Sequence, residues 1–212
     1  MDYSDEFWKS IEETLQMLLL SGLFSFAAGL ILGIALVVTR EGNILENKVI
    51  HQIIDKAVNL FRSIPFVILI TALIPLTKLI VGTFIGVKGA IFPLVVGCTP
   101  FFIRQVDMAL TDIDNGLIEA AQSMGISPMG IIFRVYLKES IPALARSTTI
   151  TAISLLGLTA MGGAVGGGGL GSFVIRYGHN RFYITYVSVV VILILVSIIQ
   201  FIGNVIIKKT SH

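Results

Sequence analysis

Five sparsely charged apolar runs, each about as long as a bilayer is thick, limit what this 212-residue chain can fold into. A helix rises about 1.5 Å per residue, so about 20 apolar residues cross the hydrocarbon core. The runs cover approximately residues 15–38, 57–81, 89–108, 142–165 and 183–207. Hydrophobic residues make up 55% of the chain, and its mean hydropathy is +0.91. These values lie outside the soluble range and predict an all-α polytopic membrane protein with five transmembrane helices in one domain, 1–212.

The second and third runs contain internal prolines, which are Pro65 and Pro75 in one and Pro93 and Pro100 in the other. A proline in a membrane helix leaves a backbone carbonyl without its usual partner, and a neighbouring helix must satisfy it. We therefore expect two kinked helices, packed inside the bundle.

The distribution of basic residues predicts the orientation, because short cytoplasmic loops are enriched in lysine and arginine. One set of predicted loops and helix ends holds ten basic residues, whereas the opposite set holds five. The first set includes the segment 109–141 and the carboxyl terminus, which are expected to be cytoplasmic. The acidic amino terminus is expected outside, and without a basic leader the first run is expected to stay as a transmembrane helix.

Several function classes lack the residues they need. No basic run is interleaved with aromatics, which excludes nucleic acid as a partner, and no GxxxxGK[ST] motif is present to hold a nucleotide. Cys98 stands alone, and the histidines are far apart in sequence, so no metal or catalytic cluster is indicated. The histidines are His51, His179 and His212. We expect neither a cofactor, nor a metal, nor enzymatic activity in this chain.

A polar-edged segment at 115–128 interrupts the membrane-length runs. Asn115 is expected to cap a helix whose apolar residues share one face, Gly125 suits its end, and Ser127-Pro128 suits the start of a second helix. The candidate contact residues are Asn115, Leu117, Ile118, Glu119, Ala120, Ala121, Met124, Gly125, Ser127 and Pro128. This cytoplasmic helix–break–helix is either a docking element for a partner or a hairpin that lies on the membrane surface, and periodicity alone leaves both open.

A glycine cluster follows the fourth run, from Gly162 to Gly171. Its formal GxGxxG pattern follows an apolar helix rather than a strand, so a dinucleotide site is rejected. Met161, Gly162 and Gly163 are instead candidates for an outer gate, with the long side chain of Met161 as a plug; the alternative is a flexible helix end.

Polar residues in the spans give two further expectations. Ser154 and the neighbouring threonines of the fourth run either line a pathway or hydrogen-bond to the carbonyl one turn back. No acidic residue lies in the middle of a span, and Arg62, Arg104 and Asp107 fall near predicted cytoplasmic ends. This pattern disfavours a proton-coupled transporter and favours energy supplied from outside the bilayer.

The sequence also resembles a known family. Glu119-Ala120-Ala121, Gly125 and the downstream Ile141-Pro142 resemble the EAA motif of ABC-importer permeases, with isoleucine in place of the usual leucine. Three further stretches, in the same order along the chain, resemble the permease subunit of methionine-type importers. They are Phe61-Arg62-Ser63-Ile64-Pro65-Phe66, Ile80-Val81-Gly82-Thr83 and Met161 to Gly171.

The resemblance implies a homodimer in the bacterial inner membrane that forms the pathway for methionine, as either enantiomer or a derivative. It also implies two copies of a cytoplasmic ABC ATPase, which bind ATP and magnesium and hold the 115–128 segment. A periplasmic or lipid-anchored binding protein would deliver the substrate, and lipid surrounds the chain. The alternatives are an ABC permease for another amino acid or small organic solute, and an ion-coupled secondary transporter.

Overall fold

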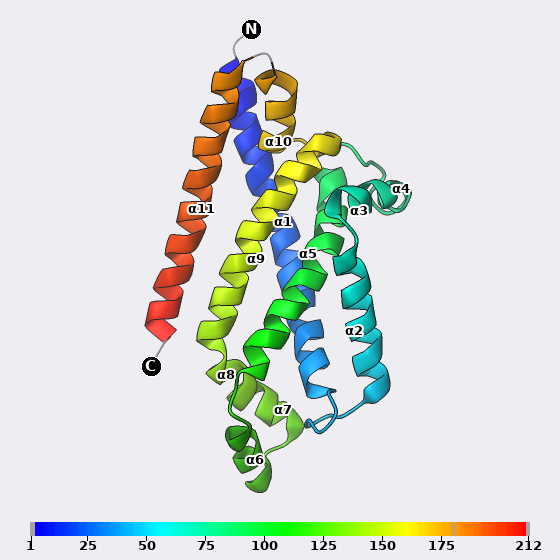
Figure 1. Cartoon of the computed structure of the whole chain (residues 1–212), viewed down its shortest axis with the longest axis vertical. Coiled ribbons are helices and arrows are strands. Elements are labelled where there is room, and N and C mark those ends of the chain that lie inside the picture. Colours follow the sequence, from blue (N-terminus) through cyan, green and yellow to red (C-terminus); the bar gives the residue numbers. More distant parts are fainter. Residues whose placement is uncertain (1–2, 180, 211–212) are drawn as a thin grey trace.

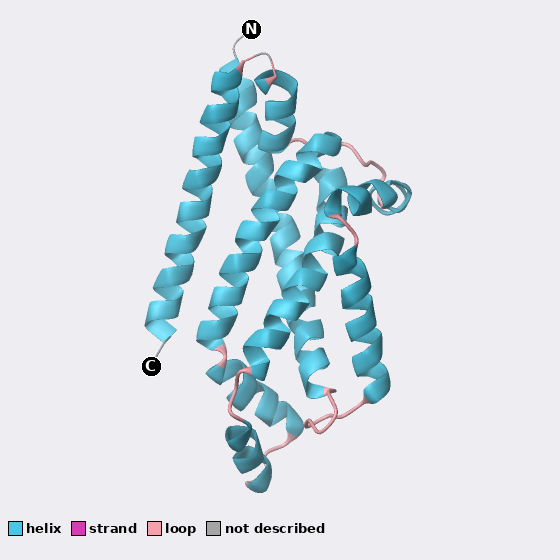
Figure 2. Ribbon diagram, viewed as in Figure 1, coloured by secondary structure: helices cyan, strands magenta, loops and turns pink. Residues whose placement is uncertain are grey.

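The computed structural model describes residues 3–179 and 181–210, so His212 lies outside the described residues. Within them every regular element is a helix, as Figure 2 shows. The α-helices are α1 (Tyr3–Val38), α2 (Lys48–Ser63), α3 (Phe66–Ala72), α4 (Ile74–Val81), α5 (Gly86–Thr111), α6 (Asn115–Ser123), α7 (Pro128–Ile131), α8 (Leu137–Glu139), α9 (Ile141–Gly162), α10 (Gly169–Phe173) and α11 (Phe182–Thr210). Three π-helical turns are η1 (Ile132–Tyr136), η2 (Gly163–Gly167) and η3 (Val174–Gly178).

Helices α1, α5, α9 and α11 are long and apolar enough to cross a membrane, and within the described part of the chain no other helix is. They correspond to the first, third, fourth and fifth apolar runs, so four of the five predicted long apolar helices are confirmed. Helix α1 begins well before the predicted residue 15. Pro93 and Pro100 both lie inside α5 without ending it.

The second apolar run is not one kinked helix, and that prediction was wrong. It is divided among the end of α2, α3 and α4 (Figure 1). Pro65 has no N–H to continue α2, and Ile64 before it takes an extended conformation with φ −87° and ψ 123°. A second break lies at Leu73, just before Pro75. Helix α2 also begins earlier than expected, at an N-cap where the Asn47 side chain accepts from two backbone N–H groups.

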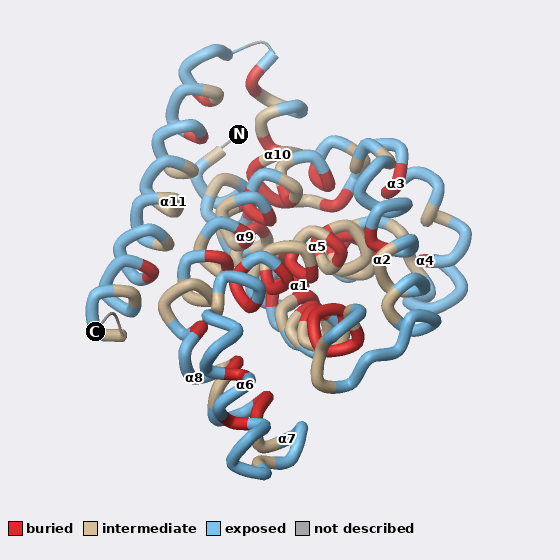
Figure 3. The backbone as a smooth tube through the Cα atoms, turned by 60° about the horizontal axis from the view of Figure 1, so that its bottom comes forward, coloured by how far each residue is buried: buried red, intermediate tan, exposed pale blue. Residues whose placement is uncertain are grey.

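The core of the bundle is the contact between α1 and α5, with α9 packed against both. Glycines on α1 allow this close approach: a methyl group added at Gly29 would lie 2.7 Å from Phe102, and one at Gly33 would lie 2.6 Å from Val106. Helix α11 lies at the edge and is mostly exposed, as Figure 3 shows.

The two ends of the bundle carry different connections (Figure 1). The carboxyl ends of α1 and α5, the start of α2 and the whole α6–α8 segment lie at one end. The start of α1, α10 and the start of α11 lie at the other. The 115–128 segment and the glycine cluster are therefore at opposite ends of the molecule.

Candidate functional site

Helix α6 is the first half of the predicted helix–break–helix. Its N-cap is Asp114, whose Oδ1 accepts from the backbone N–H of Gly116 at 2.9 Å. The prediction of Asn115 as the cap was wrong by one residue. Both residue types suit the position, but Asp114 has extended backbone, with ψ 121°, whereas Asn115 is already helical.

The break and the second helix form as predicted. Gly125 adopts φ +73°, which costs least for glycine, and the N–H of Ile126 donates to the carbonyl of Ala121 at 3.1 Å. Ser127 caps α7 by accepting from the N–H of Gly130 at 3.3 Å, and Pro128 occupies the first turn. Two short helices therefore meet at a fixed turn.

The structure divides the predicted apolar face of α6 into a buried part and an exposed part. Ile118 (9% exposed) and Ala121 (2%) face inward, whereas Leu117 (47%) and Met124 (71%) face outward. Ala120 lies on the same exposed side as Leu117 and Met124. The apolar residues of α6 form one continuous face, and spacing alone did not identify which part of that face is buried. The exposed apolar face, defined here as Leu117, Ala120 and Met124, remains free for contact.

The buried side joins α6 to the long helices. Ile118 and Ala121 belong to one apolar cluster whose other members come from the ends of α1 and α5 and from α7 and η1. These other members are Val37, Val38, Phe102, Val106, Leu110, Ile131, Ile132 and Tyr136. Because interiors of this kind are close-packed, displacing α6 displaces the ends of α1 and α5 as well.

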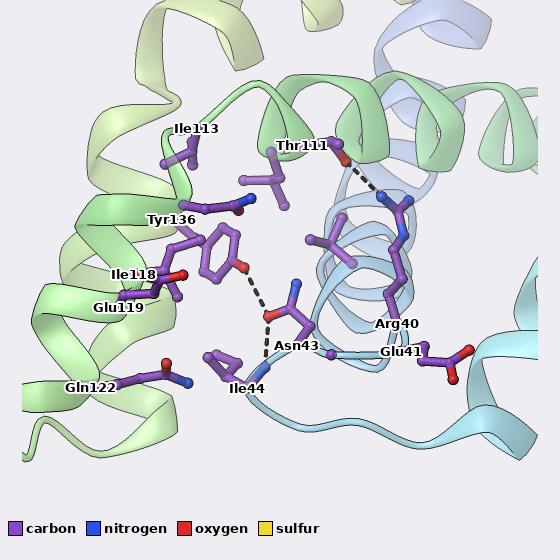
Figure 4. Close-up of a pocket in the computed structure, with 14 residues that line it drawn as sticks. Arg40, Glu41, Asn43, Ile44, Thr111, Ile113, Ile118, Glu119, Gln122 and Tyr136 are labelled. Atoms are coloured by element: carbon purple, nitrogen blue, oxygen red, sulfur yellow. Dashed lines mark hydrogen bonds between the residues drawn. The ribbon is translucent and has the colours of Figure 1, made fainter.

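Tyr136, in the same cluster, also makes a hydrogen bond to the loop after α1 (Figure 4). It is fully buried, and its hydroxyl donates to Oδ1 of Asn43 at 2.9 Å. Burial raises the pKa of Tyr136, so the hydroxyl stays protonated and remains a donor at neutral pH. The same Asn43 oxygen accepts from the N–H of Ile44 at 2.7 Å, which fixes the loop after α1.

A cavity of about 360 Å³ opens between this loop, the end of α5 and α6. Figure 4 shows polar side chains from both walls, with Arg40, Glu41 and Asn43 on one side and Glu119 and Gln122 on the other. Charged and polar side chains line this cavity beside α6, which fits a surface that meets water rather than lipid.

A network of ion pairs next to the cavity connects the end of α1 with α5 and α2. Asp107 of α5 binds Arg40 at the end of α1 (2.6 Å) and Arg104 of α5 (3.0 Å). Arg104 also binds Asp55 of α2 at 2.7 Å. The carboxylate of Asp107 is thus shared by two arginines.

The predicted gate residues lie near the end of α9. Met161 is 47% exposed, whereas Gly162 and Gly163 are buried. Ser154 and Met161 share one exposed stripe of α9 with Gly157, beside which a methyl group would meet nothing within 4 Å. A role in a pathway or gate stays a prediction.

The polar side chains of α9 mostly bond to their own helix. The hydroxyl of Ser154 donates to the carbonyl of Ile150 at 3.0 Å, and those of Thr148, Thr149 and Thr151 do the same one turn back. The local hydrogen-bonding alternative is therefore confirmed for these residues.

The glycine cluster is held in place rather than free. The N–H of Gly169 donates to Oε2 of Glu13 at 2.7 Å, and the N–H of Leu170 donates to Oγ1 of Thr14 at 2.9 Å. Both acceptors come from α1, 156 residues away in sequence. No local pattern could have identified Glu13 and Thr14, or the partnership of Tyr136 with Asn43 across 93 residues.

Comparisons with known proteins identify the family. Residues 25–210 match the family described as binding-protein-dependent transport system inner membrane component. A Vibrio cholerae protein named "Probable D-methionine transport system permease protein MetI" is 46% identical over 94% of this chain and 90% of its own length. A Bacillus subtilis protein named "Methionine import system permease protein MetP" is 48% identical over 95% of this chain and 91% of its own length.

Solved structures agree with the sequence matches. A structure described as showing inward-facing conformations of the MetNI methionine ABC transporter superposes with a TM-score of 0.96. It is 44% identical and covers 99% of this chain and 98% of its own. An amino acid ABC transporter described with histidines has a TM-score of 0.79 at 16% identity, covers 98% of this chain and 95% of its own, and shares the fold. This chain belongs to the family of inner membrane components of binding-protein-dependent transport systems.

Proposed function

We propose that this chain is the membrane-spanning permease subunit of an ATP-driven methionine importer, and that it forms the translocation pathway as a homodimer. Relatives named for methionine transport match it at 46% and 48% identity over nearly their whole length. The family assignment favours this function over an ion-coupled secondary transporter, because the family is binding-protein-dependent. Methionine of either configuration, or a derivative, is the proposed substrate.

The observation that carries the proposal is the two-sided packing of α6. One side is fixed to the ends of α1 and α5 through Ile118 and Ala121. The other side presents the exposed apolar face of Leu117, Ala120 and Met124. A helix exposed to water on an apolar face is typical of a docking surface. A partner that holds this face can therefore move the long helices directly.

The partner that we propose is a cytoplasmic ABC ATPase, two copies of which bind ATP and magnesium and dock on the two α6 helices of the homodimer. Closure of the ATPase pair moves both α6 helices together, and rigid-body motion of this kind switches the side on which a pathway opens. The α6 end then faces the cytoplasm of a bacterial cell. A periplasmic or lipid-anchored binding protein releases methionine at the opposite end, near the glycine cluster.

Copurification tests this docking. We expect the tagged chain, co-expressed with its ATPase, to retain the ATPase when it is solubilised from membranes. Leu117→Glu and Met124→Glu each place a charge on the exposed apolar face, and each should reduce the recovered ATPase about 10-fold or more.

Gln122→Glu is the matched control, because it adds the same charge to the opposite side of the same helix. It should leave the recovered ATPase within about 2-fold of the parent. Equal recovery from all three variants, or no ATPase recovered with the parent chain, would contradict the docking.

A further inference from the structure

Arg62 is exposed on the side of α2 but lies well along the bundle from the α6 end, although its sequence position suggested a cytoplasmic helix end. Helix α2 starts at Lys48, at the α6 end of the molecule, and Arg62 follows 14 residues later (Figure 1). At about 1.5 Å per residue, this places Arg62 about 21 Å along the helix axis. Among the described residues, no acidic side chain lies within ion-pair distance of Arg62. A cation at such depth without a carboxylate partner is costly, and such residues commonly mark a substrate pathway.

A cavity of about 250 Å³ lies beside Arg62, between α2, α3, α5 and α9. Its wall includes Gly97 and Cys98, close to the middle of the 26-residue α5, and Ser154, close to the middle of the 22-residue α9. The cavity is therefore at mid-height of the bundle. It also reaches the exposed stripe of α9 that contains Ser154 and Met161, so it borders the surface where a pathway is predicted.

The wall combines an apolar pocket with a polar rim. Aromatic, sulfur and leucine side chains form most of it, and Arg62 and Ser154 supply the charged and hydroxyl groups. The aromatic and sulfur residues are Phe61, Phe66, Phe101 and Cys98. A thioether or a similar unbranched apolar group packs favourably against aromatic rings of this kind. Gly97 makes room for one of them, because a methyl group there would lie 2.8 Å from the Phe66 ring.

The break between α2 and α3 adds acceptors at the same place. The carbonyl of Phe61 would normally accept from the N–H four residues later, but that residue is Pro65 and has no N–H. The end of a helix also carries partial negative charge on its last carbonyls. An arginine and the last carbonyls of α2 thus lie at one end of the same cavity. In transporters with discontinuous helices, carbonyls at such helix ends bind cations.

We propose that this cavity is a binding site within the permease for the transported zwitterionic amino acid. Arg62 binds its carboxylate, the carbonyl of Phe61 and the hydroxyl of Ser154 accept from its ammonium group, and the apolar side chain lies among the phenylalanines. The proposal rests on the proposed function, because it assumes that an amino acid crosses this chain. The permease would then select against charged side chains in addition to any selection by the binding protein.

Transport by the reconstituted complex tests the role of Arg62. The permease, its ATPase and its binding protein are placed in proteoliposomes, and the initial rates of methionine uptake and ATP hydrolysis are measured. Arg62→Gln should reduce methionine uptake about 10-fold or more while the ATPase still copurifies. Arg62→Lys should recover part of the uptake, and the matched control Lys56→Gln, on the same helix, should leave it within about 2-fold.

Direct binding to the parent complex needs no variant. Labelled methionine should bind the solubilised permease–ATPase complex without the binding protein, and unlabelled methionine should displace it. Methionine methyl ester, which lacks the carboxylate, should displace it about 10-fold less well.

Equal displacement by the ester, or unchanged uptake in Arg62→Gln, would overturn this site and leave the importer function standing. A parent complex that imports no methionine at all would instead overturn the proposed function, and this site with it.

Discussion

The hairpin around Gly125 and the turn around Gly171 lie at opposite ends of the bundle, and each needs glycine for a different reason (Figure 1). Gly125 has φ +73°, and a methyl group added to it would meet nothing within 4 Å. Gly171 lies in α10 with ordinary helical backbone, but a methyl group there would lie 2.1 Å from the carbonyl oxygen of Ala160. The first glycine is required for conformation and the second for space.

This difference matches what each end has to do in the proposed importer. The α6–α7 hairpin stays exposed and keeps a fixed shape, so that a partner can hold one side while the other side moves α1 and α5. The glycine cluster packs backbone against backbone, and Glu13 and Thr14 hold it to α1. Substitutions in the glycine cluster should therefore mainly lower the stability of the protein. Substitutions in the α6–α7 hairpin should mainly lower coupling, which is the amount of methionine imported per ATP hydrolysed.

The largest effect is expected for Gly171→Ala, because its methyl group overlaps backbone that cannot move aside. We expect the free energy of unfolding to fall by about 3 kcal/mol or more, measured as loss of folded protein in a thermal scan in detergent. Gly157→Ala is the control, since that site is open. It should leave stability unchanged or raise it by up to about 1 kcal/mol. Equal stability of both variants would show that the close packing around Gly171 is not needed.

Ile118→Ala should have the next largest effect, because it removes a buried side chain that joins α6 to the core. The loss should be about 2–4 kcal/mol in the free energy of unfolding, together with reduced ATPase recovery. Leu117→Ala, one residue away on the exposed face, should change stability by less than about 0.5 kcal/mol and still reduce ATPase recovery. If the two variants had the same effect on stability, the assignment of buried and exposed sides would be wrong.

Gly125→Ala should lower stability by about 1–2 kcal/mol, because alanine is strained at φ +73°. Its larger consequence is expected in coupling, measured as methionine imported per ATP hydrolysed. Gly125→Asn should retain most of the coupling, since asparagine tolerates the left-handed conformation. Alanine and asparagine variants with identical coupling would argue against a conformational requirement.

Tyr136→Phe should have the smallest effect, about 1 kcal/mol, because it removes one hydrogen bond and keeps the ring. Asn43→Ala should cost more, since it also removes the acceptor for the N–H of Ile44. The comparison is a thermal scan of both variants at neutral pH. A larger loss for Tyr136→Phe than for Asn43→Ala would reverse the proposed roles.

The sequence predicted those features of the fold that depend only on residues close together in the chain. Four long helices follow from apolar length, and the α6–α7 break follows from the turn chemistry of Gly125 and Ser127-Pro128. The division of residues 57–81 was missed, because Pro93 and Pro100 lie within a continuous α5 while Pro65 ends α2. Whether a proline bends or ends a membrane helix depends on the packing around it.

The candidate site was predicted in position but not in orientation. Ile118 and Ala121 face the core because Tyr136, Val37 and Leu110 lie beneath them, and these contacts come from distant segments. The position of Arg62 along the bundle could not be predicted from the sequence either, because it depends on where α2 begins. Contacts such as Glu13 with Gly169 leave no local signal at all.

The central claim is that movement of α6 by an ATPase drives transport through this chain. The most direct test is methionine uptake into proteoliposomes that contain the permease, its ATPase and its binding protein, with and without ATP. The account predicts uptake only with ATP, and its loss in Met124→Glu. Uptake driven by an ion gradient without ATP, or unchanged uptake in Met124→Glu, would contradict it.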